Sequence, residues 1–311
     1  MKVVYLGTPD FAVLPLKKLL TAGHEIVAVV TQPDKPKGRH GTPVFSPVKQ
    51  IAVENSLNVL QYDKIRVEGV QDLKDLNADI FVTCAFGQIL SQEIIDIPKY
   101  GILNIHASLL PKYRGAAPIQ WAIINGDEYT GVTIMKTEAG IDTGDTLISK
   151  AVKIGDKETA GELFDRLSVV GAELIVDALD LIESGKAVFV QQDDTASTHV
   201  KMLKKEDGNI DWSASSKSID CLVRGMNPWP SAYTYYGGKI IKIWSIEICQ
   251  TERSDVCGQI LTSDRKNGII VSTGDGAVKI KELQLEGSKR MSADAFLLGR
   301  NFTVGEVFNG E

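Results

Sequence analysis

Residues 78–106 read ADIFVTCAFGQILSQEIIDIPKYGILNIH. Two runs within this stretch, Ala78–Cys84 and Gly101–His106, are mainly apolar at successive positions. A strand that is apolar on both faces is covered on both sides, which is typical of the parallel sheets of α/β proteins. The stretch therefore predicts two central strands of such a sheet.

Strand-like and helix-like segments alternate on either side of this stretch. The expected strands are Lys2–Leu6, Ile26–Thr31, Val59–Leu60 and Thr146–Val152. The expected helices, recognised by apolar spacings of three and four residues, are Phe11–Ala22, Pro47–Asn55, Val67–Leu76 and Gly161–Ser184. The alternation predicts the α/β fold class, with a Rossmann-like, mostly parallel sheet and helices on both faces.

The last third of the chain has a different character. Glycine turns separate five short β-rich runs: Ala232–Tyr236, Lys239–Ile248, Gly258–Leu261, Gly268–Thr273 and Ala277–Leu285. Short strands at this spacing are typical of a small β-barrel, so we expect a C-terminal OB-like domain. The 311 residues suffice for two domains, which we place at residues 1–190 and 208–311 with an aperiodic linker at 191–207.

Composition limits the classes of partner. The net charge of −6 gives the chain no bulk attraction to nucleic acid or to an anionic membrane, so a nucleic-acid partner must be held by local basic patches. No apolar run approaches the roughly 20 residues of a membrane span, and the first residues do not form a signal peptide. The four cysteines lack zinc-ligand spacing and are typical of free thiols in a reducing compartment. We expect a cytoplasmic protein with no metal and no membrane partner.

Asn104 and His106 are the most informative polar residues. Because alternate residues of a strand point to the same face, an amide and an imidazole project together at the end of the Gly101–His106 run. Asp142, in an Asp-Thr-Gly sequence, is able to reach them from a later loop. An amide donor, a titratable ring and a carboxylate suit acyl transfer. The alternatives are a structural histidine and an Asx-turn at Asp142.

Other strand ends carry unusual residues as well. Gly7 and the pair Phe86–Gly87 end strands at the same edge as His106, which is where parallel sheets bind ligands. A flat heterocycle suits the ring and backbone near Phe86, although helix capping explains this sequence equally well. The glycine fingerprint of dinucleotide-binding proteins is absent after the first strand, so dinucleotide binding is not expected.

A long loop follows the second expected strand. Residues 32–43 are rich in proline and glycine and contain the cations Lys35, Lys37 and Arg39. Loops of this length are usually functional or disordered, and these cations are suited to holding phosphates. A solvated loop without a ligand is the equally weighted alternative.

Together these residues resemble the formyltetrahydrofolate-dependent formyltransferase family. The resemblance rests on Asn104-x-His106, Ser108-Leu-Leu-Pro111, Arg114-Gly115 and Asp142-Thr-Gly144. It extends over essentially the whole chain through Gly7–Ala12, Thr31–Arg39, Arg114–Gln120, Lys205–Trp212 and Asn227–Pro230. It implies that residues 1–190 are the catalytic domain and that residues 208–311 bind tRNA.

The resemblance also implies an enzyme with a specific reaction. The formyl group of the co-substrate 10-formyltetrahydrofolate passes to the α-amino group of methionyl-initiator tRNA by direct attack of the amine, giving N-formylmethionyl-tRNA. In this scheme Asn104 and His106 stabilise the oxyanion, and Asp142 orients His106 and assists proton movement. No metal takes part.

Binding residues follow from the same resemblance. It implies that Ser108, Leu109, Leu110, Pro111, Phe86, Gln88 and Leu90 line the folate site. It points to Arg39 as a contact for the tRNA acceptor end, although the residues after Arg39 carry fewer cations than in relatives. Lys204 and Lys205 are further candidates for tRNA contact, since this substrate carries a phosphate backbone.

Three other functions compete with this prediction. A member of the same family that formylates a small amine, or one that hydrolyses formyltetrahydrofolate, uses the same site. A non-catalytic protein that binds tRNA or folate belongs to a different class, and the intact Asn104, His106 and Asp142 argue against it. We expect a monomer, since nothing in the sequence indicates obligate association.

Overall fold

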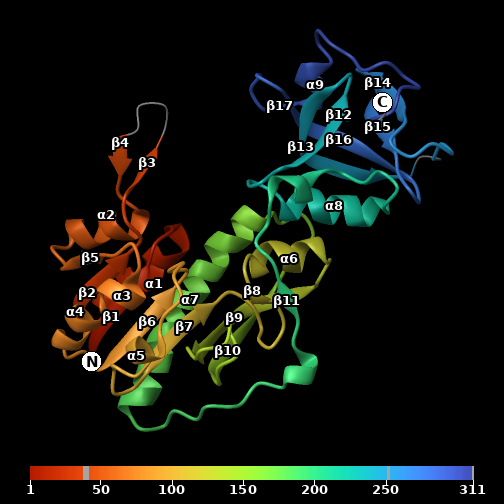
Figure 1. Ribbon diagram of the computed structural model, residues 1–311. Helices are drawn as coiled ribbons and strands as arrows, with labels where there is room; N and C mark the ends of the chain where they lie inside the picture. The colour runs from red at the N-terminus through yellow and green to blue at the C-terminus, as the bar shows by residue number, and fades with distance from the viewer. Residues whose placement is uncertain (38–41, 251–252, 310–311) are drawn as a thin grey trace. The chain divides into compact units, whose positions relative to one another are not determined.

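The computed structural model describes residues 1–37, 42–250 and 253–309 (Figure 1). The chain forms two compact units that interleave in sequence. The first unit contains Met1–Pro118, Tyr129–Lys153 and Phe164–Val200. The second unit contains Ile119–Glu128, Ile154–Leu163 and Lys201–Glu311.

A seven-stranded sheet in the order β10-β9-β7-β6-β1-β2-β5 forms the centre of the first unit. Its strands are β1 (Lys2–Gly7), β2 (Glu25–Thr31), β5 (Val59–Gln61), β6 (Ile80–Cys84), β7 (Ile102–His106), β9 (Tyr129–Lys136) and β10 (Thr146–Lys153). Neighbours are parallel from β5 to β7, whereas β9 runs antiparallel to both β7 and β10. This arrangement confirms the predicted mostly parallel sheet, to which β9 is an unpredicted addition.

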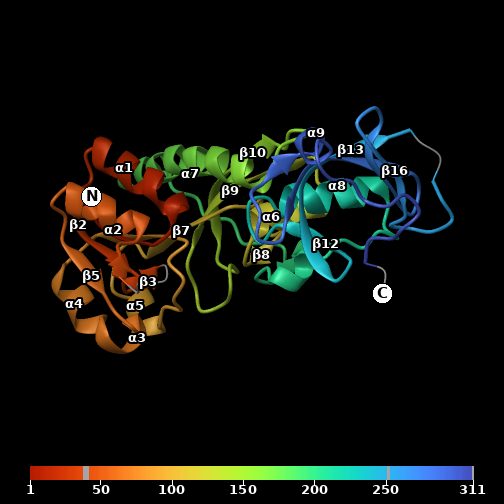
Figure 2. The same cartoon turned by 90° about the horizontal axis from the view of Figure 1, so that it is seen from above.

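Helices cover both faces of this sheet. They are α1 (Val13–Thr21), α2 (Pro47–Glu54), α3 (Ile65–Glu68), α4 (Val70–Asp75), α5 (Gln92–Ile95) and α7 (Ala160–Glu183). Figure 2 shows α1 and α7 along one face and α3, α4 and α5 along the other. The single helix expected over Val67–Leu76 is instead the pair α3 and α4, which meet at Gly69.

Strand β7 shows how the two faces are used. Ile102 joins the buried cluster that includes Ile65, Leu73 and Ile94 from the short helices. Ile105, which points the other way, meets α7 so closely that a Cβ on Gly171 would lie 2.9 Å from its Cγ2. Alternation therefore places Asn104 and His106 on the same face as Ile102.

The order of the strands reverses between β1 and β6. Strand β2 lies on one side of β1 and β6 on the other, and both pairs are parallel. The strands that meet at this reversal end in Gly7 and Cys84, and the neighbouring β7 ends in His106. In doubly wound sheets this carboxyl edge is where ligands bind.

The second unit contains an antiparallel, barrel-like sheet in the order β12-β13-β16-β15-β14, with β17 paired to β16. Its strands are β12 (Ala232–Tyr236), β13 (Lys239–Cys249), β14 (Ile260–Asp264), β15 (Gly268–Ser272), β16 (Ala277–Leu285) and β17 (Met291–Ser292). The helices are α8 (Ser216–Gly225) and α9 (Ala293–Phe296), together with nearly all of α6 (Pro118–Ile124). The predicted small β domain is confirmed.

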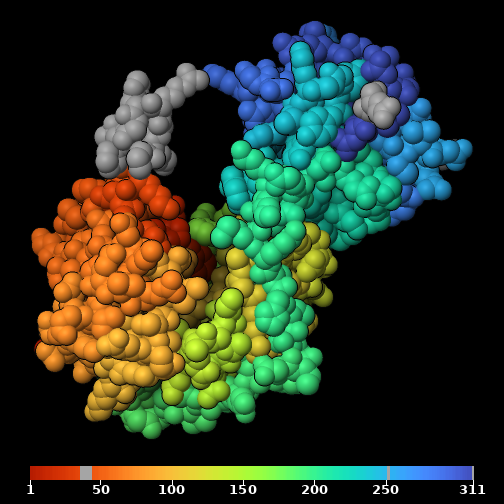
Figure 3. Space-filling model, viewed as in Figure 1, coloured from red at the N-terminus to blue at the C-terminus, as the bar shows by residue number. Residues whose placement is uncertain are grey.

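Short elements complete the chain. They are η1 (Asp10–Ala12), η2 (Asp194–Ala196), η3 (Lys205–Gly208), β3 (Lys35–Lys37), β4 (Thr42–Val44), β8 (Arg114–Gly115) and β11 (His199–Val200). Strands β8 and β11 pair in parallel, and Figure 3 shows the segment around residues 190–200 lying along the surface of the first unit. Residues 191–200, expected as part of a linker, therefore belong to the first unit. Across the described residues, none of the helices combines the length and apolarity needed to cross a bilayer.

Candidate active site

Asn104 is held by the neighbouring strand. Thr83 on β6 lies in register with Asn104, and its hydroxyl donates a 3.0 Å hydrogen bond to Oδ1 of the amide. The other end of the amide, Nδ2, faces Oδ1 of Asp142 at 3.5 Å. Because a carboxylate only accepts hydrogen bonds, the NH₂ end must face Asp142. The amide is therefore oriented from both sides.

His106 lies at the end of β7 and is buried. Its Nε2 lies 2.9 Å from the carbonyl oxygen of Tyr113, and its Nδ1 lies 3.6 Å from Oδ2 of Asp142. A carbonyl accepts hydrogen bonds, so Nε2 carries a hydrogen in this contact. This leaves Nδ1 on the side of Asp142.

Asp142 lies between these two residues. Its backbone is left-handed, with φ of +52°, which is uncommon for a residue other than glycine. Its Oδ2 accepts a 2.9 Å hydrogen bond from the backbone N–H of Gly115. The structure thus brings together the three side chains predicted to be catalytic, with Asp142 at the centre.

The loop after β7 is fixed by β11 and by Thr198, the residue before it. The backbone N–H of Tyr113 donates a 2.8 Å hydrogen bond to the hydroxyl of Thr198. Gly115 has φ of +103°, and a Cβ at this position would meet the carbonyl oxygen of Val200 at 2.4 Å. Only glycine fits this approach of the two strands, and the approach sets the position of the N–H that Asp142 uses.

The predicted folate residues of this loop follow His106 closely in sequence and are buried or half-buried. Ser108 is buried, and its hydroxyl donates a 2.7 Å hydrogen bond to the carbonyl of Lys112. The N–H of Leu110 is bound to the hydroxyl of Thr133 at 3.2 Å. Leu109 and Pro111 are half-buried.

The predicted folate residues after β6 have roles in the protein interior. Phe86 is buried in the core cluster, and Leu90 packs against that cluster. The amide of Gln88 donates to the carbonyl of Tyr62 at 2.8 Å and accepts from the N–H of Ile65 at 2.9 Å. The side chains of these three residues are therefore engaged with the protein itself, and Gly87, between Phe86 and Gln88, has φ of +83°.

The predicted tRNA-binding residues fall in both units. Lys35 is exposed on β3, whereas Lys37 ends that strand and its side chain lies outside the described part. Arg39 lies outside the described residues. Lys204 and Lys205 are exposed in the second unit.

Three residues that hold the site in place were not predicted from the sequence. Thr83 orients Asn104, Thr198 fixes the loop after β7, and Gln192 binds the backbone at Asp142. The pairing of two adjacent apolar strands gave a usable signal for Thr83. Gln192 and Thr198 lie in the aperiodic segment after α7, which gives no signal of its own.

Arg114 is a cation in the loop after β7, and its charge alone would suit a phosphate contact. In the structure only 3% of this residue is exposed, and its guanidinium group donates to Gln192 and Asp194. The guanidinium group of Arg114 is therefore paired within the first unit and is not available to a phosphate of a substrate.

The described residues offer neither a reactive cysteine at the site nor a cluster of metal-ligand side chains. Cys84 ends β6 close to the site, but burial raises the pKa of its thiol to about 12, so it is a neutral thiol rather than a nucleophile. No group of three or more His, Cys, Asp or Glu side chains among the described residues is placed to hold a metal ion.

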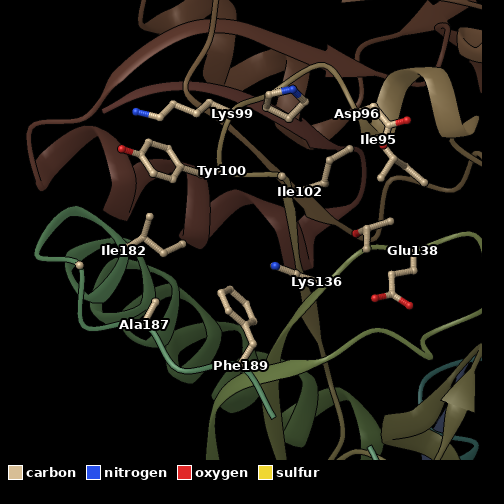
Figure 4. A pocket seen from close by; sticks show the side chains of 14 residues that line it. Ile95, Asp96, Lys99, Tyr100, Ile102, Lys136, Glu138, Ile182, Ala187 and Phe189 are labelled. Carbon is tan, nitrogen blue, oxygen red and sulfur yellow. The ribbon is translucent and has the colours of Figure 1, made fainter. Parts of the chain in front are cut away.

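A hollow of about 600 Å³ opens at the other end of β7. Figure 4 shows the side chains of Tyr100, Ile182 and Phe189 around it, with Lys136 placed over the Phe189 ring at 4.2 Å from its centroid. None of the predicted site residues lines it. It lies at the amino end of a parallel strand, opposite the edge where such sheets bind ligands, and we assign it no ligand.

Comparison with known structures shows where this fold occurs. An N-formyltransferase from Helicobacter canadensis, in complex with folinic acid and dTDP-3-aminofucose, superposes with a TM-score of 0.68 at 19% identity and covers 94% of this chain and 100% of its own. HypX from Aquifex aeolicus, in complex with tetrahydrofolic acid, superposes over 96% of this chain with a TM-score of 0.66 at 18% identity. The chain spans about half of HypX, 47% of its length.

Curated relatives are much closer in sequence. Methionyl-tRNA formyltransferase from Lachnospira eligens is 51% identical over all of both chains, and that of Agathobacter rectalis is 48% identical over 99% of each. The family model described as "Formyl transferase" matches residues 1–179, and "Formyl transferase, C-terminal domain" matches residues 202–301. These matches confirm the resemblance inferred from the site motifs, and the chain belongs to the formyl transferase family.

Proposed function

We propose that this protein transfers the formyl group of 10-formyltetrahydrofolate to the α-amino group of methionyl-initiator tRNA, giving N-formylmethionyl-tRNA. The observation that carries this proposal is the 51% identity, over the whole of both chains, to a relative named methionyl-tRNA formyltransferase. The grouping of Asn104, His106 and Asp142 supports it independently, since these groups suit transfer of an acyl group to an amine.

The reaction makes a specific demand on the site. The amine nitrogen forms a bond to the formyl carbon, and the bond from that carbon to N10 of the folate breaks. Negative charge develops on the formyl oxygen while the attacking nitrogen becomes positive. One proton leaves the attacking nitrogen and N10 gains one, so the site needs hydrogen-bond donors and a group that moves a proton.

The three central residues meet this demand. Asn104 Nδ2 donates to the formyl oxygen and the ring of His106 helps to stabilise the charge that develops there, and loss of such a group typically lowers the rate about 10²–10³-fold. Asp142 keeps the ring of His106 in place, accepts the proton of the amine and passes a proton to N10 as the bond from N10 to the formyl carbon breaks, directly or through water. Their contacts of 3.5 and 3.6 Å to Asp142 are loose, as is common before substrate binds.

The substrates are assigned to the remaining predicted residues. We propose that the backbone of Ser108–Pro111 and of Phe86–Leu90 lines the folate site. The loop with Lys35, Lys37 and Arg39 contacts the acceptor end of the tRNA, and the C-terminal domain contributes Lys204 and Lys205. We also propose that the protein acts as a monomer, since one chain supplies the whole central group.

The test is a formyl-transfer assay with 10-formyltetrahydrofolate and charged initiator tRNA. Formylmethionyl-tRNA is the expected product, with little formate released in the absence of acceptor. A dTDP-linked amino sugar serves as the competing acceptor. Transfer to the sugar alone, or formate release that does not depend on tRNA, contradicts the proposal.

Variants at the central residues test the mechanism. His106→Ala should lower turnover by about 10²–10³-fold, while the Kd for the folate changes much less. Asn104→Ala should behave in the same way. Equal losses in turnover and folate affinity would assign these residues to binding instead.

A further inference from the structure

Gln192 lies 50 residues after Asp142 and is bound to its backbone. The side-chain Nε2 donates hydrogen bonds to the carbonyl of Asp142 at 2.9 Å and to the carbonyl of Gly144 at 2.7 Å. One amide group therefore closes the turn on which the central carboxylate stands.

The orientation of this amide is fixed by a buried cation. Oε1 of Gln192 accepts from Nε and an NH₂ group of Arg114 at 3.0 and 2.9 Å. The same guanidinium binds Asp194 at 2.8 Å. Because a guanidinium only donates, it holds the oxygen of the amide toward itself and directs the NH₂ toward the two carbonyls.

Asp142 depends on such support. Its left-handed backbone is costly for a non-glycine residue and persists only when the surroundings hold it. Within the described part of the chain, its carboxylate has one short hydrogen bond, to the N–H of Gly115, and two loose contacts. Arg114 and Gly115 are the two residues of β8, so this strand holds the carboxylate directly and the backbone of Asp142 through Gln192.

We infer that Gln192 is a positioning residue for Asp142, and that the pair Arg114–Gln192 sets the place of the carboxylate in the reaction. This inference rests on the catalytic role proposed for Asp142. Among the described residues, the side chain of Gln192 binds Arg114 and the backbone carbonyls of Asp142 and Gly144, and none of the three central side chains. It therefore acts through Asp142 and does not itself take part in the chemistry.

Turnover is the quantity that should respond. Gln192→Ala should lower kcat about 10- to 100-fold, because a displacement of about 1 Å in a catalytic group costs up to about 10²-fold. The KM values for both substrates should stay within about twofold. The control is Gln191→Ala, which changes an exposed neighbour in the same segment and should leave kcat unchanged.

A second variant guards against a loss caused by misfolding. Gln192→Glu keeps an acceptor for Arg114 but places an oxygen opposite the two carbonyls. It should retain the fold, seen as an unchanged folate Kd and Tm, and still lose at least tenfold in kcat. Wild-type kcat in this variant would overturn the inference.

The double variant Asp142→Ala/Gln192→Ala, compared with each single variant, tests whether Gln192 acts through Asp142. If Gln192 acts through Asp142, adding Gln192→Ala to Asp142→Ala should change kcat less than twofold, since coupled residues are not additive. Losses that multiply overturn the positioning role. A low kcat for Asp142→Ala with a normal kcat for Gln192→Ala overturns this inference alone, whereas a normal kcat for Asp142→Ala overturns the catalytic role proposed for Asp142 as well. The proposed function itself fails only if the wild-type protein does not form formylmethionyl-tRNA.

Discussion

The backbone N–H of Gly115 donates a 2.9 Å hydrogen bond to Oδ2 of Asp142. Gly115→Ala should break this contact, because a Cβ would lie 2.4 Å from the carbonyl of Val200 and φ of +103° disfavours any side chain. We expect kcat for formyl transfer to fall by at least about tenfold, as one hydrogen bond to a charged group is lost together with the strand spacing. Steady-state kinetics on the purified variant measure it.

Gly299→Ala is the matched control for this substitution. Nothing lies within 4 Å of a Cβ at Gly299, so the same chemical change should leave kcat unaltered. A Gly115→Ala variant with wild-type turnover would show that the strand spacing does not reach the carboxylate.

Thr83→Val should lower turnover by freeing the amide of Asn104. The substitution keeps the buried shape but removes the hydroxyl that binds Oδ1 at 3.0 Å. Loss of one neutral hydrogen bond corresponds to about a 2- to 10-fold decrease in kcat. Thr83→Ser should restore activity, because it returns the hydroxyl.

Thr130→Val is the control for Thr83→Val. Thr130 is equally buried, and its hydroxyl has no hydrogen-bond partner among the described residues. Its replacement should leave kcat unchanged and should not lower the Tm. Equal effects of the two valine variants would remove Thr83 from the mechanism.

Arg39→Ala and Lys35→Ala should each raise the KM for tRNA while the folate Kd stays the same. Each removes one cation that is proposed to meet a phosphate, so the slope of log KM against log salt should become shallower by about 0.7–0.9. Lys17→Ala, which removes an exposed cation from α1, controls for net charge. An unchanged salt slope in the Arg39 variant would exclude a phosphate contact there.

His24 should make the fold less stable in mild acid. Burial, with help from the N-terminal ammonium group, lowers the pKa of His24 below its ordinary value of 6.5, against the opposing effect of Glu183 and Asp180. The unfolded chain then binds a proton more readily than the folded one, so stability is constant above pH about 6.5 and declines as the pH falls below it.

Urea midpoints at pH 7.5 and 5.5 measure this effect. Wild-type protein should lose more stability between these values than His24→Leu does. The exposed His199→Leu should keep the wild-type pH dependence. If His24→Leu shows the full wild-type decrease, other groups are responsible for it.

The sheet and the central pair were predictable because they depend on local pattern. Successive apolar residues marked β6 and β7, and alternation alone placed Asn104 and His106 on one face. The strand β9 was missed because Gly131 interrupts its apolar pattern. The structure explains that glycine, since a Cβ there would meet the carbonyl of Lys150 at 2.3 Å.

The residues that hold the site in place, Thr198 and Gln192, were not predictable from local sequence pattern. Thr198 contacts Tyr113 across 85 residues, and Gln192 contacts Asp142 across 50. Such contacts leave no periodicity in the segment that supplies them. The sequence also does not tell whether Phe86 faces a ligand or the core, and the structure places it in the core.

The pairing of β8 with β11 has a consequence for synthesis. Residues 192, 198 and 200 hold the loop that contains Tyr113 and Gly115 in place. In the sequence they come after β10, the last strand of the large sheet, and after the long helix α7. A nascent chain that has completed every strand of that sheet still lacks these residues. We therefore expect no activity before the chain has been synthesised beyond residue 200, and we expect an excised catalytic fragment to need residues up to at least 200.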